Sequence, residues 1–226
     1  MNQQIINVLD ELHNYGVLFY KDSQTELSNE DITDEKRLLD GFESDGYYHL
    51  EKLFITKDVR IVKWNGLGRF NFNKFEVDPA NEVFQSVNGV LYTKKGYDRL
   101  GKYCKKKMKE LVACPTTIIE HDIAIGTDRI CNCAFKGSNI SILNLPDTVK
   151  EIGTNSFSYA KNLNTIVLPR SICRIEPQKA DSIPLVSGIN YQNLNWPSFS
   201  GSNLELSICL NNSDKGILSK RTNPTA

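Results

Sequence analysis

The chain repeats a pattern of apolar residues at an interval of 23 residues, and this repeat limits its fold more than any other feature. Five apolar residues recur 23 positions later, in the pairs Ile140 and Leu163, Leu143 and Ile166, Leu145 and Leu168, Val149 and Ile172, and Ile152 and Ile175. A repeat of this length is typical of stacked coils, in which each coil buries its apolar side chains against the next. We therefore expect a solenoid, which presents an extended surface more readily than a catalytic cleft.

The repeat also reaches towards the N-terminus, at an interval of 22 residues. The earlier pairs are Leu50 and Phe72, Leu53 and Phe75, Ile55 and Val77, Ile130 and Ile152, and Phe135 and Phe157. Val59, Val62 and Leu67 have the spacing that Val149, Ile152 and Phe157 have later. We expect Phe135 and Phe157 to stack as an aromatic row inside the solenoid.

An interruption follows the second coil, after Val77. Asn88-Gly89 lies between two apolar segments, which is a strong hairpin signal because both residues tolerate a positive φ. The lysine-rich segment 94–109 comes next, and the third coil resumes with an ambiguous register between Ile118 and Ile125. In either register His121 or Asp122 falls near a core position.

The apolar spacing predicts which side chains face outwards. In each unit the second and third apolar residues flank one residue, so the segment reads as a short strand with a period of two. Stacked strands form a parallel sheet, and Pro146 and Pro169 fit strand ends. We expect its outward face to carry Lys52, Phe54, Lys74, Glu76, Asn144, Thr165 and Val167, with Ile142 beside them.

The two ends of the chain differ from the repeats. Residues 1–14 have the apolar spacing of an amphipathic helix, and a short helical segment fits 34–39. After Ile175 the pattern fades into a segment rich in Pro, Ser and Gly, whose last residues, 216–226, we expect to be loose. The predicted organisation is a helical and acidic N-terminal cap (1–48), a solenoid (49–178) with a hairpin and basic insertion at about 79–117, and an irregular C-terminal cap and tail (179–226).

Two segments carry a recognisable repeat signature. The segment from Ala134 to Gly153 contains Ile140-x-x-Leu143-x-Leu145-Pro146-x-x-Val149-x-x-Ile152, and the segment from Phe157 to Ile175 matches it. Both resemble the leucine-rich repeats of BspA-like bacterial proteins. The resemblance implies a right-handed leucine-rich-repeat solenoid with one short strand per coil, a binding or adhesion role and no enzyme activity. The expected fold is thus an α/β repeat solenoid, rich in β-strands, with a helical cap and a hairpin insertion.

Charge is balanced overall but uneven along the chain. With 27 basic and 27 acidic residues, nothing global indicates nucleic acid or an anionic membrane. Segment 94–109 holds eight Lys or Arg residues against Asp98, with Tyr97 and Tyr103 among them. This pattern permits a site for nucleic acid or another polyanion, formed by Lys102, Lys105, Lys106, Lys107 and Lys109. The simpler interpretation is an exposed, charged loop. The acidic segment 21–46 could also fold back onto the basic one.

No residue pattern indicates catalysis or a metal. The six cysteines include no C-x-x-C pair. Cys131 and Cys133 with His121 could form a metal site, and Cys114 with His121 a nucleophile pair, but packing as small apolar residues is the simpler interpretation. We expect no enzyme activity, no metal and no cofactor.

The predicted function is non-catalytic recognition of another protein through the sheet face. The alternatives are polyanion binding through segment 94–109 and a role as a cell-surface adhesin or structural subunit. The N-terminus has no secretory signal, and no apolar stretch approaches the ~20 residues of a membrane span. This predicts a cytoplasmic protein, or a surface or secreted one if a leader has been removed. The oligomeric state stays open.

Overall fold

The computed structural model describes residues 43–45, 47–63, 70–103, 108–163, 165–169 and 171–175, together with the strands at 17–19, 26–28, 183–184, 207–210 and 215–219. The predicted helices at 1–14 and 34–39 lie outside these residues. Every regular element in the described part is a β-strand, so the α component of the predicted fold is not confirmed. The described residues therefore include no helix with the length and hydrophobicity needed to span a membrane.

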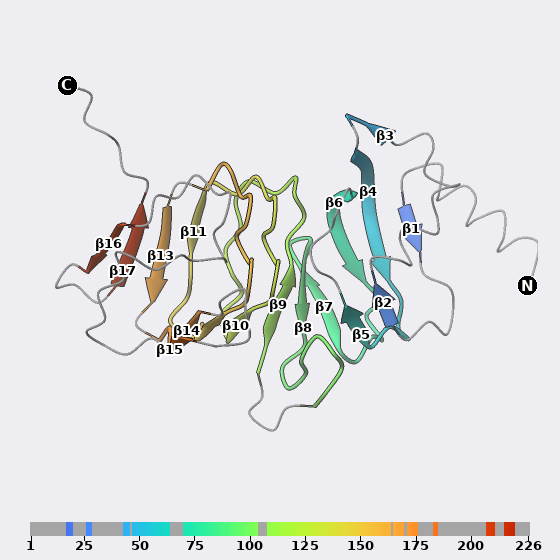
Figure 1. The fold of residues 1–226 in the computed structure, drawn as a ribbon. Helices are drawn as coiled ribbons and strands as arrows, with labels where there is room; N and C mark the ends of the chain where they lie inside the picture. Colours follow the sequence, from blue (N-terminus) through green and yellow to red (C-terminus); the bar gives the residue numbers. More distant parts are fainter. Residues whose placement is uncertain are drawn as a thin grey trace, which may run out of the picture.

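One sheet lies towards the N-terminal end of the molecule (Figure 1). It contains β1 (Val17–Phe19), β3 (Glu43–Ser44), β4 (Tyr47–Ile55) and β6 (Phe70–Val77). β4 pairs in parallel with β6, and the register sets Leu50 beside Phe72 and Leu53 beside Phe75. The predicted 22-residue interval is therefore the interval between hydrogen-bonded neighbours. β2 (Glu26–Ser28) and β5 (Ile61–Lys63) form a separate parallel pair.

A seven-stranded sheet runs along the middle of the molecule, in the order β15-β14-β12-β10-β9-β8-β7. Its strands are short: β7 (Phe84–Val87), β8 (Val90–Thr93), β9 (Glu110–Ala113), β10 (Arg129–Ile130), β12 (Glu151–Ile152), β14 (Arg174–Ile175) and β15 (Ile183–Pro184). Parallel pairing sets Ile130 beside Ile152 and Ile152 beside Ile175.

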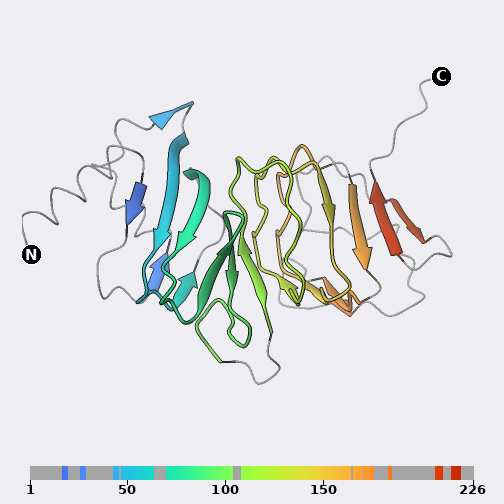
Figure 2. The same cartoon turned by 180° about the vertical axis from the view of Figure 1, so that it is seen from behind.

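A third sheet closes the other end, where Figures 1 and 2 place β16 and β17. β11 (Ile142–Asn144) pairs in parallel with β13 (Thr165–Pro169). β17 (Lys215–Ser219) then pairs antiparallel with both β13 and β16 (Ser207–Leu210). The segment predicted to be irregular, and its expected loose end, thus contain strands that cover the last parallel edge.

Each later coil contributes two strands, which corrects the expectation of one. The coil that contains β11 also contains β12, and the next contains β13 and β14. The second strand of each coil is only two residues long. The sequence reasoning missed it because Val149 and Ile152 are three residues apart, a spacing that does not show the period of two of a strand.

The core is the interior of the coils. Leu143, Ile152 and Ile166 are fully buried, and burial of such a side chain stabilises the fold by about 1.5–3 kcal/mol. The rings of Phe135 and Phe157 stack with centroids 5.2 Å apart, as predicted.

The predicted hairpin forms, but as part of the central sheet. β7 and β8 pair antiparallel around Asn88 and Gly89, whose φ values are 51° and 79°. β8 pairs in turn with β9. The description of this segment as an insertion outside the solenoid is therefore not confirmed. Its turn packs on β6, where the Phe75 N–H donates to the Gly89 carbonyl at 2.8 Å.

A buried asparagine fastens the first coil to the segment before β7. Asn81 is fully buried. Its Nδ2 donates to the carbonyl oxygens of Thr56 and Val59, each at 2.8 Å. Its Oδ1 accepts the N–H groups of Val83 at 2.9 Å and Phe84 at 2.7 Å. One side chain thus supplies partners for four backbone groups, which would otherwise have to be solvated by water.

Replacement of Asn81 should destabilise the protein strongly. In Asn81→Ala these four backbone groups lose their partner, so we expect the free energy of unfolding to fall by about 3 kcal/mol. Urea unfolding followed by circular dichroism measures this loss. Asn73→Ala is the matched control, because Asn73 is exposed. In the described part, its side-chain amide forms a hydrogen bond with Glu51 alone. Its cost should be within about 0.5 kcal/mol. Equal losses in the two variants would contradict the role assigned to Asn81.

Candidate functional site

The predicted recognition residues of the first two coils lie together at the C-terminal ends of β4 and β6. The register sets Lys52 beside Lys74 and Phe54 beside Glu76. Lys52 Nζ lies 2.6 Å from Glu76 Oε2, and Lys74 Nζ lies 3.0 Å from Glu76 Oε1. Hydrogen bonding from Lys52 lowers the pKa of Glu76, and the hydrogen bond to Glu76 raises the pKa of Lys74. The two lysines therefore neutralise Glu76 and hold it in place.

The predicted recognition residues of the later coils lie on β11 and β13. The register sets Asn144 beside Val167 and Ile142 beside Thr165. The Ile142 side chain is 56% exposed, and Asn144 is exposed. The side chains of Thr165 and Val167 lie outside the described residues. An isoleucine with this exposure is a candidate anchor for a partner.

The two groups do not share one continuous sheet. β4 and β6 belong to one sheet and β11 and β13 to another. Between them, the third coil makes backbone bonds to the fourth, in which the Asn139 and Ser141 N–H groups donate to the Thr116 and Ile119 carbonyls. Towards β6 it uses side chains: Thr117 Oγ1 donates to the Phe72 carbonyl at 2.9 Å. Sequence spacing could not show this break, because the ambiguous register of the third coil falls there.

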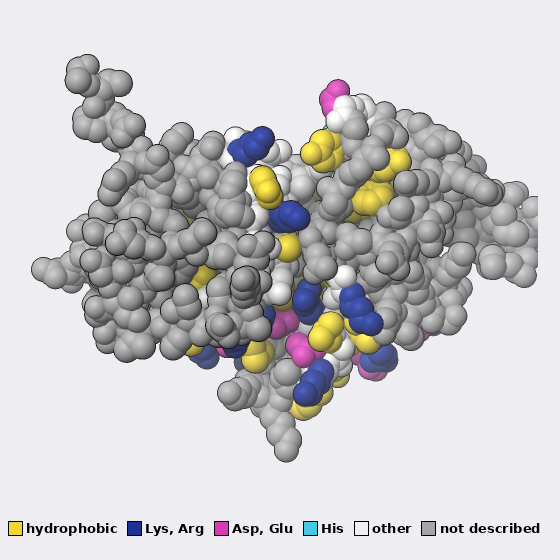
Figure 3. All heavy atoms as spheres, in the orientation of Figure 1, with side chains coloured by type: hydrophobic (Ala, Val, Ile, Leu, Met, Phe, Trp, Pro, Cys, Tyr) yellow, Lys and Arg dark blue, Asp and Glu magenta, His cyan; other side chains and the backbone are white. Residues whose placement is uncertain are grey.

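The lysine-rich segment is folded against the solenoid along part of its length. The Val62 N–H donates to the Arg99 carbonyl at 2.8 Å, and Lys94 Nζ donates to the Asn81 carbonyl. Lys109 Nζ lies 5.1 Å from the centroid of the Tyr92 ring. Tyr97 and Tyr103 pack against each other edge to face. In Figure 3 acidic side chains lie among the Lys and Arg side chains of this region.

Two acidic residues shape this segment. Asp98 Oδ1 accepts the N–H groups of Leu100 and Lys102, and buried Glu110 accepts the Arg99 N–H at 2.8 Å. Burial raises the pKa of Glu110, which the Arg99 N–H and Arg129 partly offset. Of the predicted polyanion site, Lys102 is exposed, Lys109 is half-buried, and Lys105, Lys106 and Lys107 lie outside the described residues. The polyanion site stays a prediction.

The residues considered for metal binding or nucleophilic chemistry have other partners. His121 Nε2 lies 2.6 Å from the Tyr92 hydroxyl, and the Ala124 N–H donates to that hydroxyl at 3.3 Å. The Cys131 thiol donates a hydrogen bond to Glu110 Oε2, and the buried Cys114 thiol donates one to the Pro115 carbonyl. Burial raises the pKa of both thiols. Within the described residues, no three His, Cys, Asp or Glu side chains gather as metal ligands.

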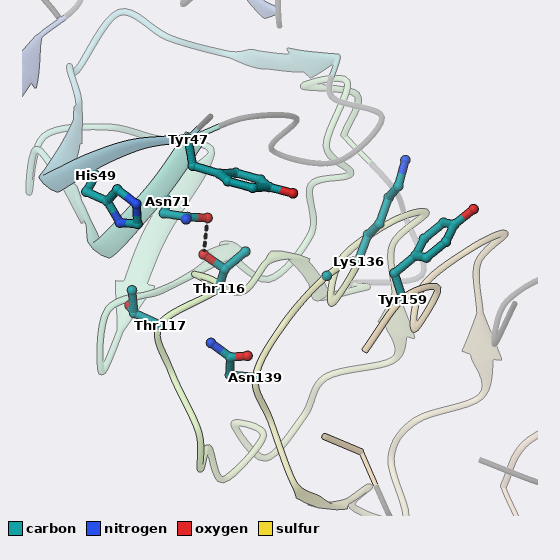
Figure 4. Close-up of a pocket in the computed structure, with 9 residues that line it drawn as sticks. Tyr47, His49, Asn71, Thr116, Thr117, Lys136, Asn139 and Tyr159 are labelled. Carbon is teal, nitrogen blue, oxygen red and sulfur yellow. Dashed lines mark hydrogen bonds between the residues drawn. The ribbon is translucent and has the colours of Figure 1, made fainter. Parts of the chain in front are cut away.

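A pocket of about 460 Å³ opens where the sheets separate. Figure 4 shows Tyr47, His49 and Asn71 on one wall, and Lys136 and Tyr159 on the opposite wall. Thr116, Thr117 and Asn139 lie between them, and Gly137 completes the lining. Thr116 Oγ1 donates to Asn71 Oδ1 at 2.7 Å across the break. The sequence reasoning missed this pocket because its walls come from coils that the repeat predicted to be in contact.

The Tyr92 and His121 pair should make stability depend on pH. Burial lowers the pKa of His121, and Asp122 partly offsets this. Between that lowered pKa and about 6.5 the unfolded state binds more protons, so the free energy of unfolding should fall as the pH drops from 7 to 5. Urea unfolding at several pH values measures the slope, which should be smaller in His121→Gln. The exposed residue His49 provides the control, His49→Gln. If the free energy of unfolding of His121→Gln depended on pH as steeply as that of the unmodified protein, the pH dependence would not come from His121.

Three solved structures show similarity to the chain, and each is bacterial. The pneumococcal vaccine antigen PcpA is 27% identical over 54% of this chain and 28% of its own, with a TM-score of 0.44. A leucine-rich cell surface protein from Faecalibacterium prausnitzii A2-165 is 17% identical over 74% and 45%, with a TM-score of 0.48. A leucine-rich-repeat protein from Eubacterium ventriosum ATCC 27560 is 16% identical over 73% and 63%, with a TM-score of 0.29. The chain therefore spans less than two thirds of each of them.

No curated protein matches the chain. A family model does match part of it. Residues 114–214 match the BspA type leucine rich repeat region, in six copies. This range begins near the end of the predicted insertion (about 79–117) and continues past residue 178, where we expected the solenoid to end. No comparison supports the cytoplasmic location predicted from the sequence, and a surface location stays a prediction. The resemblance found in the sequence is confirmed: residues 114–214 of this chain form a leucine-rich-repeat region of the BspA type.

Proposed function

We propose that this protein is a non-catalytic recognition module that binds another protein through the outward residues of β4, β6, β11 and β13. The observation that carries the proposal is the register of these strands. It sets side chains of successive coils side by side on a hydrogen-bonded backbone. A binding surface on rigid strands loses little conformational entropy when a partner docks.

The surface combines an apolar anchor with a fixed charge pattern. Ile142 offers an exposed apolar side chain, and Phe54 is half-buried between charged neighbours. Lys52, Lys74 and Glu76 form an ion-paired group that a partner need not reorganise. Protein interfaces typically depend on a few such anchors surrounded by polar contacts.

The positions of the titratable groups with shifted pKa values favour binding over catalysis. The described titratable groups with strongly shifted pKa values are buried in the fold, as Cys114 and Tyr92 are, instead of lining the pocket. A catalytic site normally exposes such groups to substrate in a cleft. We therefore place the function in the surface.

A matched pair of isoleucines tests the proposal. The full-length protein is immobilised and exposed to lysate of its source cells, with washes at about 0.15 M and about 0.5 M salt, with and without nuclease. Ile142→Glu should reduce recovery of the bound protein by at least about tenfold, because it places a charge at the anchor. Ile125→Glu is the control, because Ile125 is 86% exposed on a turn outside the proposed surface.

Two outcomes would contradict the proposal. Equal recovery with Ile142→Glu and Ile125→Glu would show that β11 takes no part in binding. Nuclease-sensitive material that washes off at high salt, and that is lost on reversal of Lys105, Lys106 and Lys107 to Glu, would move the function to the lysine-rich segment. Retention of one protein through high salt and nuclease, with loss in Ile142→Glu alone, is the expected result.

A further inference from the structure

The pocket between β6 and the third coil lies apart from the proposed recognition surface. Tyr47 and His49 come from the first half of β4, whereas Lys52 and Phe54 come from its second half. None of the predicted recognition residues of β4, β6, β11 and β13 is among the described residues that line the pocket, although Tyr47, His49 and Asn71 belong to the same strands β4 and β6. Its volume of about 460 Å³ lies within the range of pockets that bind small ligands.

Tyr159 adopts a backbone conformation that does not suit a tyrosine. Its φ is 58°, in the left-handed region, where a bulky side chain is strained. The residue 22 positions earlier is Gly137, with a φ of 70°. The repeat thus requires a left-handed residue at this position, and glycine meets the requirement without strain.

The Tyr159 side chain is also exposed. It is 56% accessible, and its ring makes no stacking contact within the described residues. A strained and exposed aromatic residue contributes little to folding. Positive φ also occurs at Cys133 and Asn155, so this backbone conformation belongs to the repeat. An exposed tyrosine in it beside a pocket points to a role in binding.

Tyr47 faces Tyr159 from the other wall. Its side chain is 46% exposed, whereas the neighbouring Tyr48 is buried and stacks on Phe70. In Figure 4 the Tyr47 ring extends across the pocket towards Lys136 and Tyr159. Tyrosine rings provide a flat apolar surface and a hydroxyl at low conformational cost.

The remaining lining supplies groups that both donate and accept hydrogen bonds. Asn71 and Asn139 belong to this class, and Asn139 Oδ1 accepts from Asn162 Nδ2 at 3.3 Å. Thr117 Oγ1 donates its hydrogen bond to the Phe72 carbonyl and offers a ligand only an acceptor. Asn71 Oδ1 accepts the hydrogen bond from Thr116 Oγ1, so the amide N–H groups of Asn71 are the groups that it offers to a ligand. Among the described residues, Lys136 is the one lining residue with a permanent charge, and no Asp or Glu lines the pocket.

We propose that this pocket binds a saccharide, with preference for a sugar that carries a carboxylate. The C–H face of a sugar ring packs on a tyrosine ring, and its hydroxyls both donate and accept hydrogen bonds, as side-chain amides do. Thr117 Oγ1 adds an acceptor. Lys136 pairs with the carboxylate. An extended peptide fits less well, because the polar groups converge from two walls and a floor and do not form a row along a strand edge.

The test uses an array of immobilised oligosaccharides, both neutral and terminated by uronic or sialic acid, with the full-length protein. The protein should bind at least one class. Tyr159→Gly should weaken that binding by at least about tenfold, with an unchanged or higher Tm because glycine relieves the strain. Lys136→Gln should weaken binding of the acidic sugars more than that of the neutral ones. Lys57→Gln, at an exposed lysine outside both the pocket and the lysine-rich segment, should leave both unchanged.

Three results would overturn the proposal. They are no binding to any saccharide, binding that Tyr159→Gly leaves intact, and a lower Tm in Tyr159→Gly. Ile142→Glu should retain saccharide binding. The pocket and the protein-recognition surface can therefore fail independently.

Discussion

Backbone hydrogen bonds between successive coils are the interaction on which the rest of this structure depends. Each coil is too short to bury its own apolar side chains, so Leu143 becomes core only when Ile166 lies beside it. The pairing interval of 22 or 23 residues fixes which side chains meet. A shift of one residue would turn the apolar side chains outwards, because adjacent residues of a strand face opposite sides.

Strand pairing is interrupted between β6 and the third coil within the described residues, and this break gives the molecule its pocket. Between β6 and the third coil, the turn of the β7–β8 hairpin and the side chains of Thr116 and Thr117 replace strand pairing. Side-chain bonds hold the backbones farther apart than a ladder does. The space that remains is lined by residues of both walls. Tyr159 shows that the repeat accepts strain there.

Charge is handled locally throughout the described residues. Lys52 and Lys74 neutralise Glu76 on the surface. The Asn81 carbonyl accepts from Lys94 at the start of the lysine-rich segment, and Glu110 accepts the Arg99 N–H within it. The segment holds eight cationic residues in a chain whose 27 basic and 27 acidic residues balance. Two of the lysines of this segment stabilise the fold: Lys94 donates a hydrogen bond to the Asn81 carbonyl, and Lys109 lies over the Tyr92 ring.

The sequence by itself determined the coil interval, the Asn88-Gly89 turn, the Phe135 and Phe157 stack and the strand neighbours within the β4–β6 pair and within the β11–β13 pair. All four follow from spacing, because apolar period and turn chemistry are local properties of the chain. Only the tertiary structure decided the second strand of each coil, the place of the hairpin in the central sheet and the pocket. These depend on which backbone groups find partners across coils, as Thr117 does with Phe72, and spacing does not record those partners.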